Sequence, residues 1–178
     1  MAAMRLEALA LGGGVIRTGM GHRRAEVVAK RVASEIGPDV AIVLAGISGG
    51  LDPALAPGDV VVATSVRDPD GEVLELSHRD ASEVAAELRR DGRTVHLGPI
   101  ASSTTIVHGE RRAALAESGA LAVDMESAWV ARAICPHRLV VVRVVADTAG
   151  NFVRGLLKGL IALRHVRPAI NRWPGAAT

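Results

Sequence analysis

The chain has 178 residues, of which 49% are hydrophobic, 2% aromatic and 22% charged, and its formal net charge is +2. This length fits one domain with a core of ordinary size, and so small a charge excess argues against nucleic acid as a partner. The single cysteine, Cys135, excludes a disulfide within the sequence and gives no zinc-ligand spacing. Because aromatic residues are scarce, the core must be built from Val, Leu, Ile and Ala, which suits a buried sheet covered by helices. We therefore predict one α/β domain over residues 1–178.

Targeting and membrane-spanning signals are not found in the sequence. The N-terminus lacks a basic segment followed by a long apolar one, and no apolar run approaches the roughly 20 residues of a membrane span. We expect a cytoplasmic protein without metal or organic cofactor and without stable membrane insertion. The segment 152–166 places Arg154, Lys158, Arg164 and His165 among leucines, a pattern that favours contact with a membrane surface.

The first part of the chain combines a glycine cluster with a short strand and a helix. A turn at residues 12–14 and a strand at 15–18 are predicted, followed by a helix of period 3.6 over about 23–36. Gly21, just before the helix, would let the backbone approach an anion, and Arg24 lies beside it. The same residues also suit an ordinary turn and a solvated helix start.

Two buried strands are predicted next. The run 40–44 is apolar throughout, and we expect the glycine-rich stretch 46–50 to end it in a loop. Backbone amides of this loop, with Ser48 and Gly49, could face a ligand, although glycine loops of this kind are often simple turns. The run 60–66 continues the sheet.

The remaining elements follow from apolar runs and amphipathic stretches. In chain order they are a hairpin return at 71–76, a helix at 82–90, a strand at 94–100, a helix at 111–117, a strand at 140–145 and a helix at 150–165. The tail from about residue 168 has two prolines and small residues, and we expect it to be loosely ordered. Arg143 lies inside a buried strand, where an unpaired charge would be costly, and Asp124 is a candidate partner.

Two acidic positions stand at the ends of apolar runs. One run ends in Val-Asp-Met-Glu-Ser at residues 123–127, directly before an Ala-rich stretch of helical character, and another ends at Asp147. In an open α/β sheet, ligands bind at such strand ends. Asp124, Ser127 and Asp147 could instead simply cap the helices that follow them.

Three ordered segments resemble motifs of the purine nucleoside phosphorylase and methylthioadenosine/S-adenosylhomocysteine nucleosidase superfamily. Residues 123–127 resemble its ribose-binding motif, residues 44–51 with 57–62 are similar to its glycine-rich strand end and the next strand, and residues 143–147 resemble the segment with its catalytic aspartate. The resemblance covers about residues 2–150. It implies a single-domain, three-layer α/β/α fold around a twisted mixed β-sheet, with the first strand shortened or missing, and a homo-oligomer.

The resemblance also implies roles for single residues. Glu126 would bind the ribose hydroxyls, Met125 would pack on the sugar, and Asp147 would protonate the leaving base. Ile106 and Val107 fall on positions that contact the base.

The sequence does not decide between water and phosphate as the nucleophile. Glu7 falls on the glutamate that activates water in the nucleosidase branch, whereas Gly21, Arg24, Ser48 and Gly49 are candidates for a phosphate or water site. Both hydrolysis and phosphorolysis, with inorganic phosphate as co-substrate, are therefore considered. Two departures from the family pattern are Ile47, where nucleosidases often have serine, and Ala146, which replaces the serine before the aspartate.

Within the superfamily, the motifs look most like the hopanoid-associated phosphorylases, which are taken to remove adenine from adenosylhopane. We therefore predict an enzyme that cleaves the N-glycosidic bond of a small-molecule nucleoside, best an adenosine with an apolar 5′ substituent. A methylthioadenosine/S-adenosylhomocysteine-type nucleosidase is the alternative enzyme, and a non-catalytic nucleoside-binding protein is the alternative from another class. A dinucleotide-binding domain is disfavoured because residues 46–50 lack the Gly-x-Gly-x-x-Gly spacing.

Overall fold

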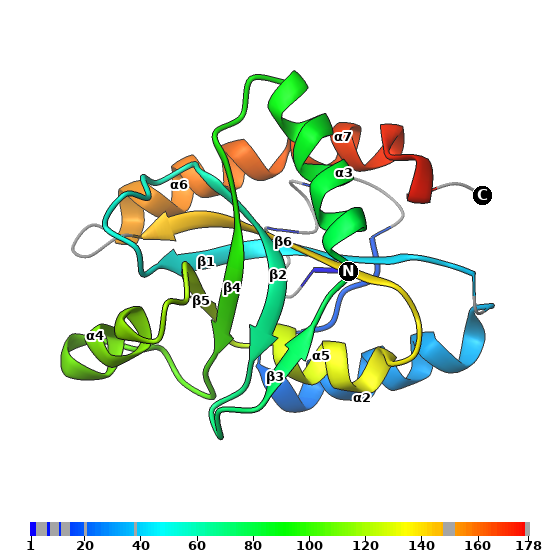
Figure 1. The fold of residues 1–178 in the computed structure, drawn as a ribbon, viewed down its shortest axis with the longest axis horizontal. Coiled ribbons are helices and arrows are strands. Elements are labelled where there is room, and N and C mark those ends of the chain that lie inside the picture. The colour runs from blue at the N-terminus through cyan, green and yellow to red at the C-terminus, as the bar shows by residue number, and fades with distance from the viewer. Residues whose placement is uncertain are drawn as a thin grey trace.

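The computed structural model describes residues 1–2, 7, 11, 15–19, 21–37, 39–147 and 152–176, with backbone alone for 152–154 and 176. A central sheet lies between two layers of helices (Figure 1). Helices α3 (His78–Arg90), α6 (Phe152–Leu163) and α7 (Val166–Arg172) cover one face, and α2 (His22–Glu35) and α5 (Ser127–Ile134) cover the other. The predicted single-domain, three-layer α/β/α fold is therefore confirmed.

The described part of the chain forms a six-stranded mixed sheet in the order β3-β2-β4-β5-β1-β6. Its strands are β1 (Ile42–Gly50), β2 (Val60–Arg67), β3 (Val73–Glu75), β4 (Val95–Ser102), β5 (Ala122–Asp124) and β6 (Leu139–Asp147). β1 pairs parallel with β6, and β2 pairs parallel with β4, whereas β3 and β5 join by antiparallel pairing with β2 and β1. An additional antiparallel pairing of β2 with β6 closes five of the strands into a ring.

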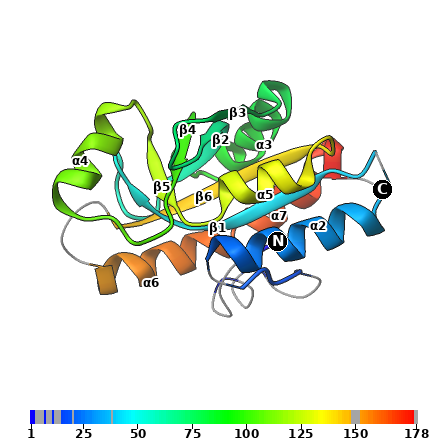
Figure 2. The same ribbon diagram turned by 90° about the horizontal axis from the view of Figure 1, so that it is seen from below.

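The alternation of side chains along β2 serves both helical layers. Val60 and Val62 pack in the cluster with α3, α6 and α7, whereas Val61 and Ala63 pack in the cluster with α2 and α5. A strand buried on both faces needs an unbroken apolar sequence, which is why this stretch reads as a continuous run of Val and Ala. Helix α4 (Gly109–Glu117) lies apart from both layers and has no buried residue of its own (Figure 2).

The glycine-rich stretch 46–50 was expected to be a loop, and this expectation is wrong. Strand β1 continues through these residues to Gly50, pairing with β6 as far as Gly49. Glycine suits this strand because a Cβ at Gly46 would collide with the side chains of Arg143 and Glu7. Helices were placed correctly, with α3 and α4 starting a few residues earlier than predicted.

The C-terminal tail also differs from the expectation of loose order. Residues 166–176 include α7 and a 3-10 turn, η1 (Pro174–Ala176), and the Trp173 side chain is only 1% exposed. Its Nε1 donates a hydrogen bond to Glu83 on α3 at 2.9 Å. One large aromatic ring therefore orders a segment whose prolines and small residues suggested otherwise.

The predicted N-terminal elements are only partly within the described residues. The expected turn at 12–14 and most of the region of the first strand lie outside them. In place of the strand predicted at 15–18, the structure has an isolated parallel bridge between Arg17 and Ala2. No described helix is long and apolar enough to cross a membrane.

Candidate active site

A cavity of about 390 Å³ lies at the C-terminal ends of β1, β5 and β6. The parallel strands β1 and β6 bring their carboxyl ends to one edge, where the short strand β5 pairs antiparallel with the end of β1, so residues far apart in sequence meet there. Its lining includes eight of the ten predicted site residues, all except Gly21 and Arg24. The described residues that line it are Glu7, Ile47, Ser48, Gly49, Thr105, Ile106, Val107, His108, Arg112, Val123, Asp124, Met125, Glu126, Ala146 and Asp147.

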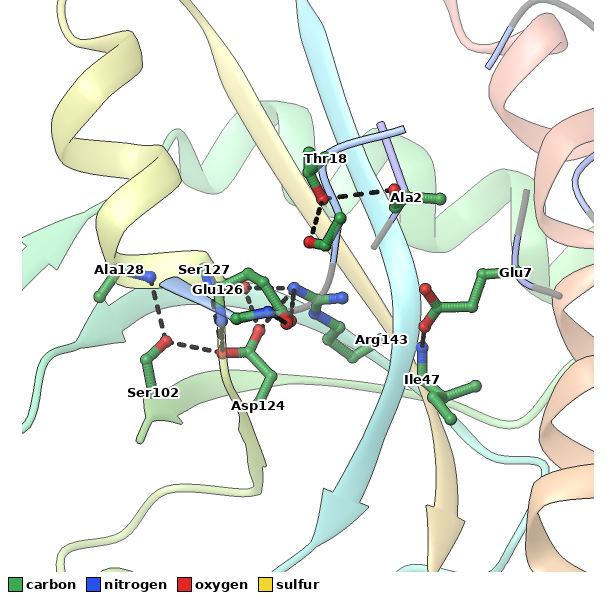
Figure 3. Close-up of polar contacts among 12 residues, drawn as sticks. Ala2, Glu7, Thr18, Ile47, Ser102, Asp124, Glu126, Ser127, Ala128 and Arg143 are labelled. Carbon is green, nitrogen blue, oxygen red and sulfur yellow. Dashed lines mark hydrogen bonds and ion pairs between the residues drawn. The ribbon is translucent and has the colours of Figure 1, made fainter. Parts of the chain in front are cut away.

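A buried arginine organises the acidic residues at one side of the cavity. Arg143 on β6 is 0% exposed, and its Nη2 lies 2.7 Å from Asp124 Oδ2 and 3.7 Å from Glu126 Oε2. Nη2 also donates to Ser127 Oγ at 3.0 Å (Figure 3). A fully buried cation needs such partners, and the predicted Arg143–Asp124 pair is confirmed.

The strand glycine Gly46 makes room for this arginine. Gly46 is the register partner of Arg143 in the β1–β6 pair. A Cβ on Gly46 would lie 2.3 Å from Arg143 Nη1 and 2.8 Å from Glu7 Oε1, which are closer than real contacts allow. Both atoms therefore approach the same point over the strand, and only glycine permits it.

Two donors of Arg143, its Nε and Nη1, are buried and bond to no group in the described part of the chain. Glu7, 2% exposed, accepts a hydrogen bond from the Ile47 amide at 2.8 Å (Figure 3). Buried donors without partners next to a carboxylate suit a water or a substrate hydroxyl.

Asp124 acts both as helix cap and as counterion. Its Oδ1 accepts from the amides of Glu126 and Ser127, each at 3.2 Å, and from Ser102 Oγ at 2.6 Å. Its Oδ2 accepts from Ser127 Oγ and pairs with Arg143. Both interpretations of this residue were therefore correct. Because its oxygens are so fully used, Asp124 positions the neighbouring Glu126 rather than offering an oxygen to a ligand.

Glu126 is a buried carboxylate at the start of α5. It is 5% exposed, and burial raises its pKa above the ordinary 4.5, opposed by the charge of Arg143 and reinforced by Asp124. Its Oε1 accepts a hydrogen bond from the Gly21 amide at 3.1 Å. Gly21, proposed for an anion of the substrate, thus binds a carboxylate of the protein itself. Arg24 is not among the described lining residues, and its Cδ packs beside Gly19.

Asp147 ends β6 at the opposite side of the cavity, where Arg112 holds it. Arg112 Nη2 donates to the carbonyl oxygens of Gly50 at 2.5 Å and Asp147 at 3.0 Å, and Nη1 lies 3.4 Å from Asp147 Oδ2. Sequence reasoning missed Arg112 and His108. Both lie at the start of α4 and belong to no motif, so only tertiary placement reveals them.

The segment before α4 supplies the residues expected to contact a base. Val107 is 4% exposed and packs with Leu51 and Val123, whereas Ile106 is 68% exposed at the cavity. Val107 therefore belongs to the core, whereas Ile106 is available to contact a ligand. Among the described residues, no three His, Cys, Asp or Glu are placed to hold a metal ion.

Comparison with known proteins agrees with this geometry. Residues 14–158 match the sequence family described as the phosphorylase superfamily. The chain belongs to this superfamily. The predicted recognition is thereby confirmed at the superfamily level, and the hopanoid-associated branch stays a prediction.

Solved structures of nucleosidases share the fold of this superfamily member. A 5′-methylthioadenosine/S-adenosylhomocysteine nucleosidase from Helicobacter pylori is 20% identical, with 96% of this chain and 95% of that chain covered and a TM-score of 0.82. Futalosine hydrolase of Helicobacter pylori is 19% identical, with 94% of each chain covered and a TM-score of 0.83. The Neisseria meningitidis 5′-methylthioadenosine/S-adenosylhomocysteine nucleosidase is 20% identical, with 96% of each chain covered and a TM-score of 0.81.

The two departures from the superfamily pattern both line the cavity. Ile47 and Ala146 make this wall of the cavity apolar. Both lie close to Gly159 of α6, where an added Cβ would be 3.3 to 3.4 Å from them. The neighbouring Ser48 has a buried hydroxyl without a partner among the described residues. Ser48 thus offers a hydroxyl at the cavity next to Ile47.

Proposed function

We propose that the protein cleaves the N-glycosidic bond of a nucleoside by hydrolysis. Membership of the phosphorylase superfamily and the fold shared with nucleosidases support glycosidic cleavage. The observation that carries hydrolysis is the arrangement of Glu7, a buried carboxylate at the cavity, beside Arg143 Nη1, which has no hydrogen-bond partner among the described residues. A carboxylate acceptor next to a fixed donor can hold a water and take its proton.

The proposed reaction assigns one task to each carboxylate. Cleavage passes through a transition state with positive charge on the sugar ring, so Glu126, bound to the 2′ and 3′ hydroxyls, stabilises it with its negative charge. Water attacks C1′ and gives its proton to Glu7, while the bond from C1′ to the base nitrogen breaks. Asp147 delivers a proton to the base nitrogen as the base leaves. Met125 packs against the sugar.

The charges of the cavity disfavour phosphate as the nucleophile. Four lining residues are carboxylates, and the one lining arginine, Arg112, already binds Asp147 and two carbonyl oxygens. The Gly21 amide is used by Glu126, and the Ile47 amide by Glu7. A dianion would therefore meet repulsion with few donors to offset it.

For the substrate we propose an adenosine with an apolar 5′ substituent. Apolar residues Ile47, Val123 and Ala146 on the cavity wall favour such a group. The Helicobacter pylori structures hold a butyl-thio inhibitor or 5′-methylthioadenosine, and these ligands carry small apolar 5′ groups. Adenosylhopane is the best guess from the sequence motifs, and a methylthioadenosine/S-adenosylhomocysteine-type activity is the alternative. The base would lie near Ile106 and Val107.

The decisive experiment measures base release from a panel of 5′-substituted adenosines with and without phosphate. We expect phosphate-independent release that falls about 100-fold or more in Glu7→Gln, because an amide cannot accept the proton. Glu83→Gln, a change at a glutamate far from the cavity, is the matched control and should keep full activity. Release that depends on phosphate would favour phosphorolysis, and binding without release from any nucleoside would favour the non-catalytic alternative.

A further inference from the structure

Positive charge is concentrated in the last part of the chain. Residues 148–178 contain five Lys or Arg residues and no Asp or Glu, although the whole chain has a formal net charge of only +2. Two of these cations are used internally, because Arg172 pairs with Glu87 and Asp91 and Arg167 donates to the Leu11 carbonyl. Of the other three, Lys158 and Arg164 are exposed, and the side chain of Arg154 lies outside the described part of the chain.

The outer face of α6 combines exposed aliphatic side chains with exposed cations. Leu157 is 63% exposed and Ile161 52%, and their spacing of four residues places them on one side of the helix. Lys158, Arg164 and His165 are exposed beside them, and none forms a salt bridge within the described residues. We call these five residues the α6 patch.

The inner face of the same helix fixes how the patch is presented. Gly155 packs so closely on β6 that a Cβ would lie 1.6 Å from the Ala146 carbonyl oxygen, and Gly159 contacts Ala146 and Ile47. Helix α6 is therefore held rigidly against the strand ends. In Figure 2 it lies along the lower edge of the molecule, with α3 and β3 on the upper side. The patch is thus carried by a helix whose other face is packed against the sheet.

We propose that the α6 patch docks the protein reversibly on the surface of an anionic lipid bilayer. Aliphatic residues flanked by Lys and Arg match the boundary between acyl chains and negative headgroups. An RNA partner is less suited, because the patch has no Phe, Tyr or Trp side chain on which bases could stack. A second copy of the chain would place two cationic patches face to face, which repel. The small number of side chains involved makes the docking weak and salt-sensitive.

The test is co-sedimentation of the full chain with phosphatidylglycerol-rich vesicles and with pure phosphatidylcholine vesicles. We expect binding to the anionic vesicles alone, weakened by added salt. We expect the partition coefficient to fall by about tenfold or more in each of two double variants, Leu157→Gln/Ile161→Gln and Lys158→Gln/Arg164→Gln. For the charged pair, this follows from a loss of roughly fivefold for each cation removed. The matched controls are Val27→Gln/Val73→Gln for the apolar pair and Arg89→Gln/Arg90→Gln for the charged pair, and both should bind like the wild type.

Several outcomes would overturn the proposal. They are no binding of the wild type to anionic vesicles, binding of both patch variants at the wild-type level, or a wild-type dimer in lipid-free solution that Leu157→Gln/Ile161→Gln dissociates. Preferential binding of RNA through the same residues would also contradict it. Because both patch variants leave the cavity residues unchanged, their nucleoside cleavage in detergent-free buffer should stay at the wild-type level, so this test can fail independently of the proposed function.

Discussion

Two networks of arginine and carboxylate groups in this protein solve the same electrostatic problem in opposite ways. Arg138 binds buried Asp80 with two bonds, at 2.6 and 3.1 Å, stacks 5.5 Å from the Trp173 ring and keeps its side chain 43% exposed. Arg143 is wholly buried among several carboxylates, yet two of its nitrogens have no partner in the described chain. The first network holds an exposed cation on one buried carboxylate, whereas the second holds a buried cation among carboxylates that line the cavity. The second network is therefore the one that can act on a ligand.

Removing the arginine of each network should separate them most strongly. Arg143→Met leaves Asp124 buried without its cation, so we expect a loss of about 3–5 kcal/mol in the free energy of unfolding and no measurable base release. Arg138→Met should lose only about 1–2 kcal/mol, because solvent can replace part of the exposed guanidinium. Urea unfolding followed by circular dichroism measures both values. Equal losses in the two variants would mean that the networks do not differ as described.

Asp147→Asn tests the acid on the side of the cavity held by Arg112. An amide keeps the shape but cannot deliver a proton, so turnover of a natural nucleoside should fall by about 100-fold or more. A nitrophenyl riboside, whose leaving group needs no protonation, should be largely spared. If Asp147 were only a helix cap, both substrates would lose activity in the same proportion, and the role as acid would have to be abandoned.

Gly46→Ala should damage the buried network without touching any charge. The added Cβ would lie 2.3 Å from Arg143 Nη1, and the side chain of Arg143 is wholly buried, so it has little room to shift. We expect a stability loss of about 1–3 kcal/mol together with impaired catalysis. Gly37→Ala is the matched control, since nothing lies within 4 Å of its added Cβ. Wild-type stability and activity in Gly46→Ala would show that the arginine is free to shift.

Glu126→Gln should lower activity by about tenfold or more, because a neutral amide holds the ribose hydroxyls less tightly and gives no charge to the transition state.

The stability of the same variant, compared with the wild type, should depend on pH. A carboxyl whose pKa is raised by folding destabilises the fold once it ionises above its folded pKa, and this penalty vanishes below the unfolded value near 4.5. The variant should therefore melt no lower than the wild type at alkaline pH, and its relative advantage should shrink as the pH falls. The quantity to compare is the melting temperature of the variant minus that of the wild type. A smaller difference at alkaline pH than at acid pH would contradict the raised pKa.

Trp173→Phe should have the smallest effect and change stability alone. It removes the hydrogen bond to Glu83, so we expect a loss of about 1 kcal/mol in unfolding free energy with unchanged kcat and KM. Thermal melting and steady-state kinetics on the same preparation measure both. A loosely ordered tail would instead predict no change in melting at all.

The sequence was sufficient for the parts of the fold that rest on apolar periodicity and for the residues carried by motifs. The strands β2, β4 and β6 were predicted within a few residues, and Glu126 and Asp147 do meet at one cavity because strand ends converge. The Arg143–Asp124 pair followed from the cost of burying a lone charge.

Features that depend on a distant neighbour could not be predicted. Residues 46–50 look like a turn, and only Arg143, nearly a hundred positions later in the chain, explains why strand β1 contains glycine at 46. Arg112 is one of many surface-type arginines until α4 is placed over the ends of β1 and β6. The order of the tail depends on the pocket that α3 offers to Trp173.

The central claim, that Glu7 and Arg143 hold a water nucleophile, is tested most directly by the chemical form of the released sugar. The enzyme would be given its best nucleoside in phosphate buffer, and the sugar product would be analysed by mass spectrometry. We predict free sugar and no sugar 1-phosphate, and Glu7→Gln should yield almost no product. Sugar 1-phosphate as the product would contradict the account.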